Sequence, residues 1–120
     1  MVKKILVVDD DPGTLKLVGA LLKSKNFDVL FAEDGLDALV KIQNENPDLV
    51  VLDVMLPEIN GYDICYQLRF NKAFKKVPII LMTTRDQEMS DKIGQKSNIE
   101  YMSKPINSKL LFENLDRLLS

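Results

Sequence analysis

Short apolar runs alternate with helical segments along the chain. The runs at 5–8, 49–52 and 77–81 are rich in Ile, Leu and Val, which is typical of strands covered on both faces. Further strands are predicted at 27–31 and 99–102. Helices are predicted at 12–25, 34–45, 62–71 and 87–96, the last of these mostly polar, and from Asn107 or Ser108 onward. Five strands that alternate with five helices predict an α/β fold, in which helices cover both faces of a parallel sheet.

Polar residues mark where several of these elements begin and end. Asp11 can cap the first helix and Pro12 suits its first turn. Asn26 is a reasonable end for the same helix, and Asn46-Pro47 ends the second. The connections are short, and no linker or low-complexity segment interrupts them. We therefore expect residues 1–120 to form a single domain, which is a usual length for one core.

The charge balance and the lengths of the apolar runs indicate which partners and which cellular location to expect. The chain has 16 basic and 18 acidic residues, so its net charge of −2 favours neither nucleic acid nor an anionic membrane as a partner. No apolar run approaches the roughly 18 residues that span a bilayer, and the amino terminus lacks a signal-peptide pattern. The single cysteine, Cys65, cannot form an internal disulfide and is expected to fill the core. These features predict a cytoplasmic protein.

The chain contains no histidine, which excludes several chemistries. Serine–histidine and cysteine–histidine nucleophile systems are impossible, and so are zinc sites that use histidine. With one cysteine, any metal site must be built from oxygen ligands. Such ligands favour a hard cation, namely magnesium, calcium or manganese.

Chemically active side chains follow the carboxyl ends of the predicted strands, where ligands bind in open parallel sheets. Asp9 and Asp10 end the first strand and Asp53 ends the third. Thr83 ends the fourth strand, and the fifth runs into Lys104. Three clustered carboxylates repel one another unless one is protonated or a divalent cation lies among them. A metal, a lysine and a hydroxyl together form a set of groups suited to phosphoryl transfer.

A single aspartate at a strand end is more often a turn or helix cap, and a single Lys-Pro is usually a solvated turn. Capping does not explain why polar groups end four strands at the same edge. The motifs that combine them lie at 5–12, 48–57, 61–62, 78–83 and 104–105. In these motifs the chain resembles, from end to end, the receiver domain of two-component response regulators, of the chemotaxis-regulator type. The resemblance implies a flavodoxin-like (βα)5 fold with strand order 2-1-3-4-5.

The resemblance also implies a role for each residue at the sheet edge. Asp53 would be the phosphoryl acceptor, and Thr83 and Lys104 would contact the phosphoryl oxygens. Magnesium would be held by Asp9, Asp10, Asp53 and the backbone carbonyl of Met55. The phosphoryl donor would be a sensor histidine kinase or a histidine phosphotransfer protein, because this chain has no histidine of its own. The domain would catalyse only its own phosphorylation and dephosphorylation.

The same resemblance predicts how phosphorylation would be read. Thr83 would move toward the phosphoryl group and Tyr101 would rotate inward. The surface formed by the fourth helix, the fifth strand and the fifth helix would then control a downstream protein or output domain, and the phosphorylated form could dimerise. Met55 and Arg85 occupy positions that tune phosphoryl lifetime in the family, and an apolar Met55 suggests slow hydrolysis. Thr84 stands where the family usually has a smaller residue.

Two other classes of protein share parts of this pattern. An aspartate-nucleophile phosphatase would use a similar strand-end aspartate, lysine and magnesium, but it typically has an acid where this chain has Met55. A flavodoxin-like cofactor binder would need a phosphate loop after the first strand, where Asp9 and Asp10 would repel the phosphate. On the first helix, Leu17 is predicted to point away from the core and Leu21 to lie at its flank. They could dock a partner helix, or Leu21 could pack on the last helix and leave Leu17 as an isolated surface residue.

Overall fold

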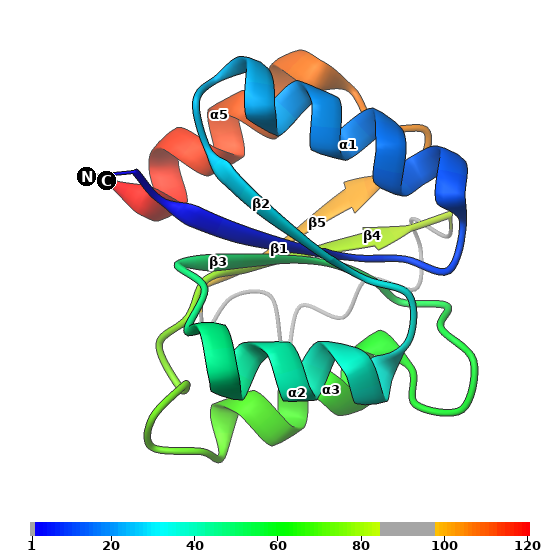
Figure 1. Ribbon diagram of the computed structural model, residues 1–120, viewed down its shortest axis with the longest axis vertical. Helices are drawn as coiled ribbons and strands as arrows, with labels where there is room; N and C mark the ends of the chain where they lie inside the picture. Colours follow the sequence, from blue (N-terminus) through cyan, green and yellow to red (C-terminus); the bar gives the residue numbers. More distant parts are fainter. Residues whose placement is uncertain (1, 85–97) are drawn as a thin grey trace.

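The computed structural model describes residues 2–84 and 98–120 (Figure 1). Their elements, in chain order, are β1 Lys4–Val8, α1 Pro12–Ser24, β2 Asp28–Ala32, α2 Gly35–Glu45, β3 Leu49–Asp53, α3 Gly61–Arg69, β4 Ile79–Thr83, β5 Ile99–Ser103 and α5 Ser108–Leu119. The predicted helix at 87–96 lies outside the described residues. Among the described residues, no helix has both the length and the apolar character needed to cross a membrane.

The five strands form one parallel sheet with the order β2-β1-β3-β4-β5. Helices α1 and α5 cover one face, and α2 and α3 cover the other (Figure 1). The predicted fold class and strand order are therefore confirmed. All described residues of β1 except the first are buried, as are all those of β3 and β4, because these inner strands have helices on both sides.

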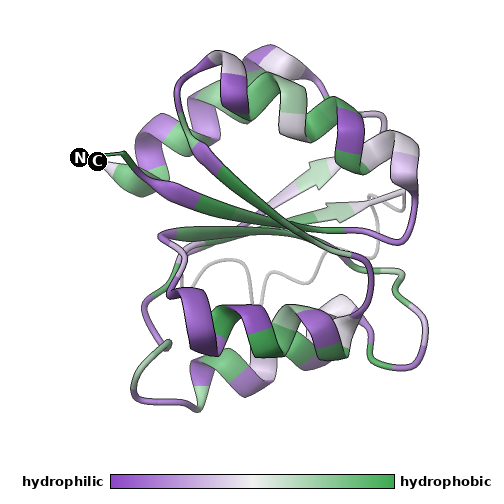
Figure 2. Ribbon diagram, in the orientation of Figure 1, coloured by the Kyte–Doolittle hydropathy of each residue, from purple (hydrophilic) through white to green (hydrophobic). Residues whose placement is uncertain are grey.

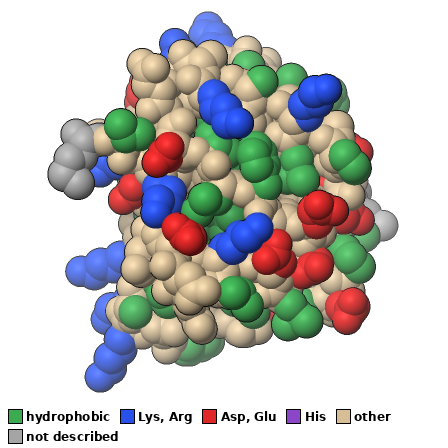
Figure 3. All heavy atoms as spheres, in the orientation of Figure 1, with side chains coloured by type: hydrophobic (Ala, Val, Ile, Leu, Met, Phe, Trp, Pro, Cys, Tyr) green, Lys and Arg blue, Asp and Glu red, His purple; other side chains and the backbone are tan. Residues whose placement is uncertain are grey.

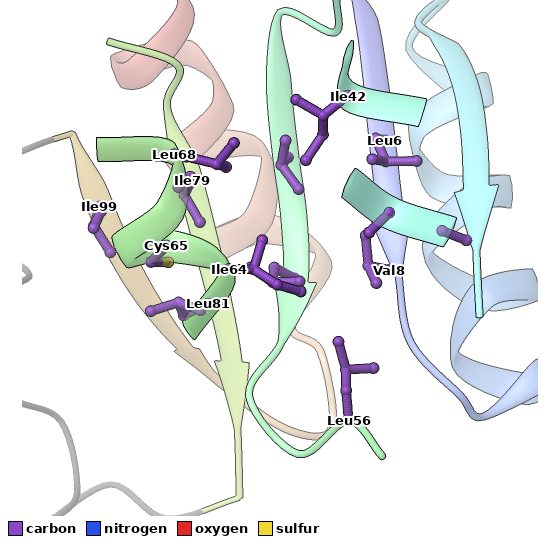
Figure 4. Packing of buried hydrophobic residues seen from close by; sticks show 14 of the residues in the cluster. Leu6, Val8, Ile42, Leu56, Ile64, Cys65, Leu68, Ile79, Leu81 and Ile99 are labelled. Carbon is purple, nitrogen blue, oxygen red and sulfur yellow. The ribbon is translucent and has the colours of Figure 1, made fainter. Parts of the chain in front are cut away.

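The sheet separates two apolar clusters, and successive residues of a strand belong to opposite ones. In β3, Val50 and Leu52 pack under α2 and α3, whereas Leu49 and Val51 pack under α1 and α5. Figure 2 shows the apolar strands between helices in which hydrophobic and polar residues alternate. Figure 4 shows the α2–α3 cluster, in which Cys65 lies against the sheet as predicted.

Most helix starts are fixed by an aspartate or asparagine cap. The side chain of Asp11 accepts from Gly13 N at 3.2 Å, and Pro12 opens α1 as predicted. Asp34, Asn60 and Asn107 accept equivalent bonds at α2, α3 and α5. These bonds satisfy backbone donors that a helix leaves unpaired in its first turn.

Several predicted boundaries were displaced by one or two residues. Strand β4 covers 79–83 rather than 77–81, because Val77 N bonds back to Phe74 O at 3.2 Å and Pro78 has no N–H to donate to a ladder. Helix α3 ends at Arg69 rather than at residue 71, and Asn71 belongs to the following turn. Helix α1 ends at Ser24, and Asn26 then adopts a left-handed backbone with φ of 68°.

Candidate functional site

Three carboxylates meet at the carboxyl edge of the sheet. Asp9 and Asp10 follow β1 and Asp53 ends β3, and these strands pair directly, with Val8 opposite Leu52. One oxygen from each of the three carboxylates lies within 4.8 Å of the other two. Asp9 is fully buried and Asp53 is 3% exposed, whereas Asp10 is exposed. The predicted acidic cluster is therefore formed, with one face open to solvent.

Lys104 brings a positive charge into this cluster from the connection that follows β5, the strand at one edge of the sheet. Its Nζ lies 2.7 Å from Asp9 Oδ2 and 3.4 Å from Asp53 Oδ2. Its backbone N donates to Thr83 O at 3.0 Å, which extends the pairing of β4 with β5 by one residue. The connection after β5 thus places the ammonium group across the end of β4, between two carboxylates.

Burial and neighbouring charges shift the protonation equilibria of the central pair. Desolvation raises the pKa of Asp53, and the charge of Asp9 adds to this, although the Met55 amide and Lys104 act in the opposite direction. Burial alone would lower the pKa of Lys104, but its hydrogen bond to Asp9 and the charge of Asp53 outweigh it and raise that pKa. Lys104 is therefore positively charged at neutral pH.

Hydrogen bonds and one close backbone approach fix the position of Asp53. Met55 N donates to Asp53 Oδ1 at 3.2 Å, and Val54 N donates to Met82 O at 3.0 Å. Gly61 N donates to Val54 O at 2.9 Å. A Cβ at Gly61 would lie 2.6 Å from Asp53 O and 2.9 Å from Val54 Cα. The start of α3 therefore packs directly on the backbone that carries the Asp53 carboxylate, and only glycine leaves room for this contact.

Sequence reasoning placed Gly61 only within the family motif at 61–62 and did not predict this supporting role. A glycine at the first position of a helix, directly after an Asn cap, was the available signal. Asp9 has a comparable support, because its Oδ1 accepts from Asp11 N at 2.9 Å. Hydrogen bonding to Thr14 and Gly13 lowers the pKa of the exposed Asp11, as expected for its capping role.

The donor set suits a hard divalent cation. Three carboxylates offer only oxygen atoms, which magnesium prefers, and the open face around Asp10 leaves room for retained water and phosphate oxygens. The ammonium group of Lys104 occupies one side of the cluster and leaves the other available. The described residues therefore fit a magnesium site at the carboxylates.

The remaining predicted residues lie around this cluster. Thr83 is buried at the end of β4, one residue beyond Met82, which pairs with Asp53. Tyr101 is half-buried on β5 and packs against the α2–α3 cluster. Met55 is 62% exposed, two residues after Asp53, and Thr84 is exposed. Arg85 lies outside the described residues.

The two leucines on α1 differ in their environments. Leu17 is 48% exposed, as predicted for a residue that points away from the core. Leu21 is half-buried and packs against the cluster that contains Leu111 and Leu115 of α5. Leu21 thus adds to this cluster rather than to a free surface.

Residues 5–116 match the family described as the response regulator receiver domain. The chain is 42% identical over 110 residues to the alkaline phosphatase synthesis transcriptional regulatory protein PhoP of Bacillus subtilis, an alignment that covers 91% of this chain and 45% of PhoP. It is 31% identical over 118 residues to the protein PilH of Pseudomonas aeruginosa, covering 98% of each. The chain thus spans less than half of PhoP and nearly all of PilH.

Solved structures show the same fold. The chemotaxis response regulator CheY4 of Vibrio cholerae superimposes with a TM-score of 0.88 at 28% identity, covering 99% of this chain and all of that one (100%). The receiver domain of a sensor histidine kinase of Pseudomonas aeruginosa, solved with a magnesium ion coordinated in its active-site cleft, gives a TM-score of 0.86 at 28% identity and covers 99% and 98% of the two chains. None of these relatives supports the phosphatase alternative. The chain belongs to the response regulator receiver domain family, whose members accept phosphoryl groups from histidine kinases in two-component signalling.

Proposed function

We propose that Asp53 is the residue that accepts the phosphoryl group. The observation that carries this assignment is the position of Lys104 Nζ, which lies 3.4 Å from Asp53 and 2.7 Å from Asp9 at the open edge of the sheet. Asp9 and Asp53 are each held by an amide on one oxygen and face the ammonium group with the other, so the choice of Asp53 rests on its place in the family motif at 48–57. Asp9 is fully buried and therefore less able to reach a donor.

In the proposed reaction, a carboxylate oxygen of Asp53 attacks the phosphorus of a phosphohistidine on a kinase or phosphotransfer protein. The new O–P bond forms as the N–P bond breaks, and the histidine nitrogen keeps the bonding pair. Lys104 then exchanges part of its contact with the carboxylates for the phosphoryl oxygens, and the Thr83 hydroxyl donates to one of them. The product is an acyl phosphate, which water hydrolyses and so ends the signal.

The magnesium ligands in this proposal are Asp9, Asp10, Asp53 and the carbonyl of Met55. When bound, the cation neutralises negative charge on the carboxylates and on the incoming phosphoryl group. This role is supported by the oxygen-only donor set and by the magnesium in the related receiver domain. The ammonium group alone cannot balance three carboxylates and a phosphoryl group.

The proposed readout links Thr83 to Tyr101. Thr83 pairs with Ser103 in the sheet, and Tyr101 lies two residues earlier on the same strand, opposite Leu81. Movement of Thr83 toward the phosphoryl group would leave space that the half-buried ring of Tyr101 can enter. The surface formed by β5 and α5 would then present a different shape to a downstream protein or output domain, or to a second phosphorylated copy. The predicted fourth helix at 87–96, which belongs to the same proposed surface, lies outside the described residues.

Intact mass spectrometry tests the acceptor. We expect incubation with magnesium and acetyl phosphate or phosphoramidate to add one phosphoryl group to the wild-type protein and none to Asp53→Asn. Asp116→Asn is the matched control, since it removes an exposed carboxylate on α5, far from the cluster, and should be phosphorylated normally. An adduct on Asp53→Asn at the wild-type level would contradict the assignment. Beryllofluoride binding would separate a short-lived phosphorylated form from a domain that cannot be phosphorylated.

Met55 is proposed to shield the phosphoryl group from water. Its side chain is 62% exposed directly beside Asp53, and it carries no group that could orient a water molecule. We expect Met55→Asn to shorten the lifetime of the phosphorylated form several-fold. Leu36→Asn is the control, because Leu36 has a similar exposure of 59% on α2 but no link to Asp53. A decay rate that Met55→Asn leaves unchanged would refute the shielding role.

A further inference from the structure

The amino-terminal edge of the sheet carries a groove that phosphoryl transfer does not use. The groove has a volume of about 490 Å³ and lies between the start of β3 and the connection from α3 to β4. Its lining residues are Pro47, Asp48, Lys72, Ala73, Lys75, Lys76, Val77 and Pro78. We call it the α3–β4 groove.

Three exposed lysines make this groove positive, namely Lys72, Lys75 and Lys76. In the part of the chain that the structure describes, none of them forms an ion pair with a carboxylate. The acidic lining residue, Asp48, accepts from the backbone N of Lys4 at 2.7 Å, and its one charge does not balance three. Figure 3 shows Lys and Arg side chains projecting at the lower left of the molecule, over the α3–β4 connection.

The backbone that carries these lysines is well braced. Arg69 Nη2 donates to Val77 O at 2.7 Å and Nη1 donates to Phe74 O at 3.4 Å. The side chain of Asn71 accepts from Ala73 N at 2.8 Å, and Phe74 is buried in the core. A ligand at the groove would therefore meet a preorganised turn, and little backbone entropy would be lost on binding.

Apolar surface accompanies the charge. The lining includes Ala73, Val77 and Pro78, and Phe70 precedes the first lysine by two residues. The side chain of Phe70 is 85% exposed, the highest value among the large hydrophobic residues that the structure describes. Phe70 does not line the groove, but it lies close to the lysines in the chain, and exposed aromatic residues are enriched at protein-binding surfaces.

We propose that the α3–β4 groove binds an acidic segment of a partner protein, in extended conformation and with at least one leucine or phenylalanine that contacts Phe70. The three ammonium groups complement carboxylates, and the apolar lining accommodates the side chains between them. The groove is concave, which suits an inserted chain better than a flat bilayer surface. Among the described residues, two aromatic side chains near the groove are exposed, Tyr66 and Phe70, and they offer few stacking platforms for single-stranded nucleic acid, which usually stacks on several.

This site would act independently of the phosphoryl switch. The groove lies at the start of β3, and Asp53 ends the same five-residue strand. At about 3.3 Å per residue, the two ends are roughly 15 Å apart. A partner segment bound in the groove would leave the carboxylate site open, so binding would persist in both phosphorylation states.

Fluorescence anisotropy tests the proposal with a fluorescein-labelled peptide of glutamates with a leucine at every third position. We expect the triple variant Lys72→Gln, Lys75→Gln, Lys76→Gln to bind this peptide about tenfold more weakly, because three exposed charge pairs of modest strength are lost together. The matched control replaces Lys16, Lys23 and Lys109 with Gln, which changes the net charge equally, and it should bind within about twofold of wild type. Thermal melting checks that both variants are folded.

Further binding measurements test which class of ligand the α3–β4 groove binds. We expect Phe70→Ser to weaken binding and the peptide with lysine in place of glutamate not to bind, and we expect beryllofluoride with magnesium to leave the affinity unchanged. Equal losses in the two triple variants would overturn the proposal, because the attraction would then be one of net charge. It would also be overturned if vesicles with anionic lipid or single-stranded DNA bound through these lysines while the peptide did not.

Discussion

Gly61→Ala tests whether the close contact between α3 and β3 positions the acceptor. The added Cβ would lie 2.6 Å from Asp53 O, 2.9 Å from Val54 Cα and 3.1 Å from the Asp53 carbonyl carbon. Carbon atoms in favourable contact are about 3.5–4.0 Å apart. Because all three neighbours are backbone atoms, the first turn of α3 and the end of β3 would have to separate by about 0.5–1 Å.

The expected cost follows from this displacement. Overpacking of this kind costs about 1–3 kcal/mol, and alanine recovers at most about 1 kcal/mol through its higher helix propensity. We therefore expect a loss of about 1–2 kcal/mol in the free energy of unfolding, which corresponds to a fall in Tm of about 5 °C. A carboxylate displaced by this amount should also be phosphorylated about tenfold or more slowly.

Thermal unfolding and the rate of phosphorylation by acetyl phosphate measure the two effects. Gly13→Ala is the matched control, because Gly13 also lies in the first turn of a helix but its Cβ would meet only the Asp11 carboxylate, at 3.6 Å. The control should melt at or slightly above the wild-type temperature. If Gly61→Ala matched the control in both Tm and phosphorylation rate, the argument that this contact positions Asp53 would be refuted.

Three further predictions concern titratable groups. The pKa of Asp53 is raised above its ordinary 3.8, so the folded state holds this proton more tightly than the unfolded state, and the free energy of unfolding of the protein falls as pH rises from 3.8 through the folded pKa. Urea titrations in EDTA from pH 4 to 7 should show a smaller fall for Asp53→Asn than for wild type. An equal fall in the two proteins would contradict this. Lys104→Met leaves the buried Asp9 without its cation, so we expect a loss of about 2 kcal/mol by urea denaturation and little phosphorylation, whereas wild-type stability would be evidence against the ion pair. Burial raises the pKa of Cys65 to about 12, so a thiol reagent at pH 8 should label it only after denaturation, and rapid native labelling would refute its placement in the core.

The fold was predictable because its inner strands are buried on both faces. Continuous apolar runs such as Leu49–Leu52 are typical only of strands with helices on both sides, and they set the fold class. The start of β4 was predicted less well. Val77 is apolar and β-branched, but its N–H donates to Phe74 O in a turn that follows α3, and a local sequence pattern does not show which partner an amide will find.

The residues of the candidate site also differ in how well the sequence predicted them. Asp9, Asp10, Asp53 and Lys104 were predictable because parallel topology brings strand ends together whatever the side-chain details. Gly61 was not, since its role depends on how closely a helix approaches a strand from another part of the chain. The positive charge of the α3–β4 groove was not predicted, because the net charge of −2 is a sum over the whole chain. Such a sum does not show that three lysines line one groove.

The separation of the core by the sheet has a consequence for how substitutions combine. Leu6 and Ile5 are adjacent in β1, yet Leu6 packs under α2 and α3 while Ile5 packs under α1 and α5. Side chains that share no neighbours usually contribute additively to stability. The two helical layers can therefore be repacked separately, as long as the strand backbone between them keeps its position.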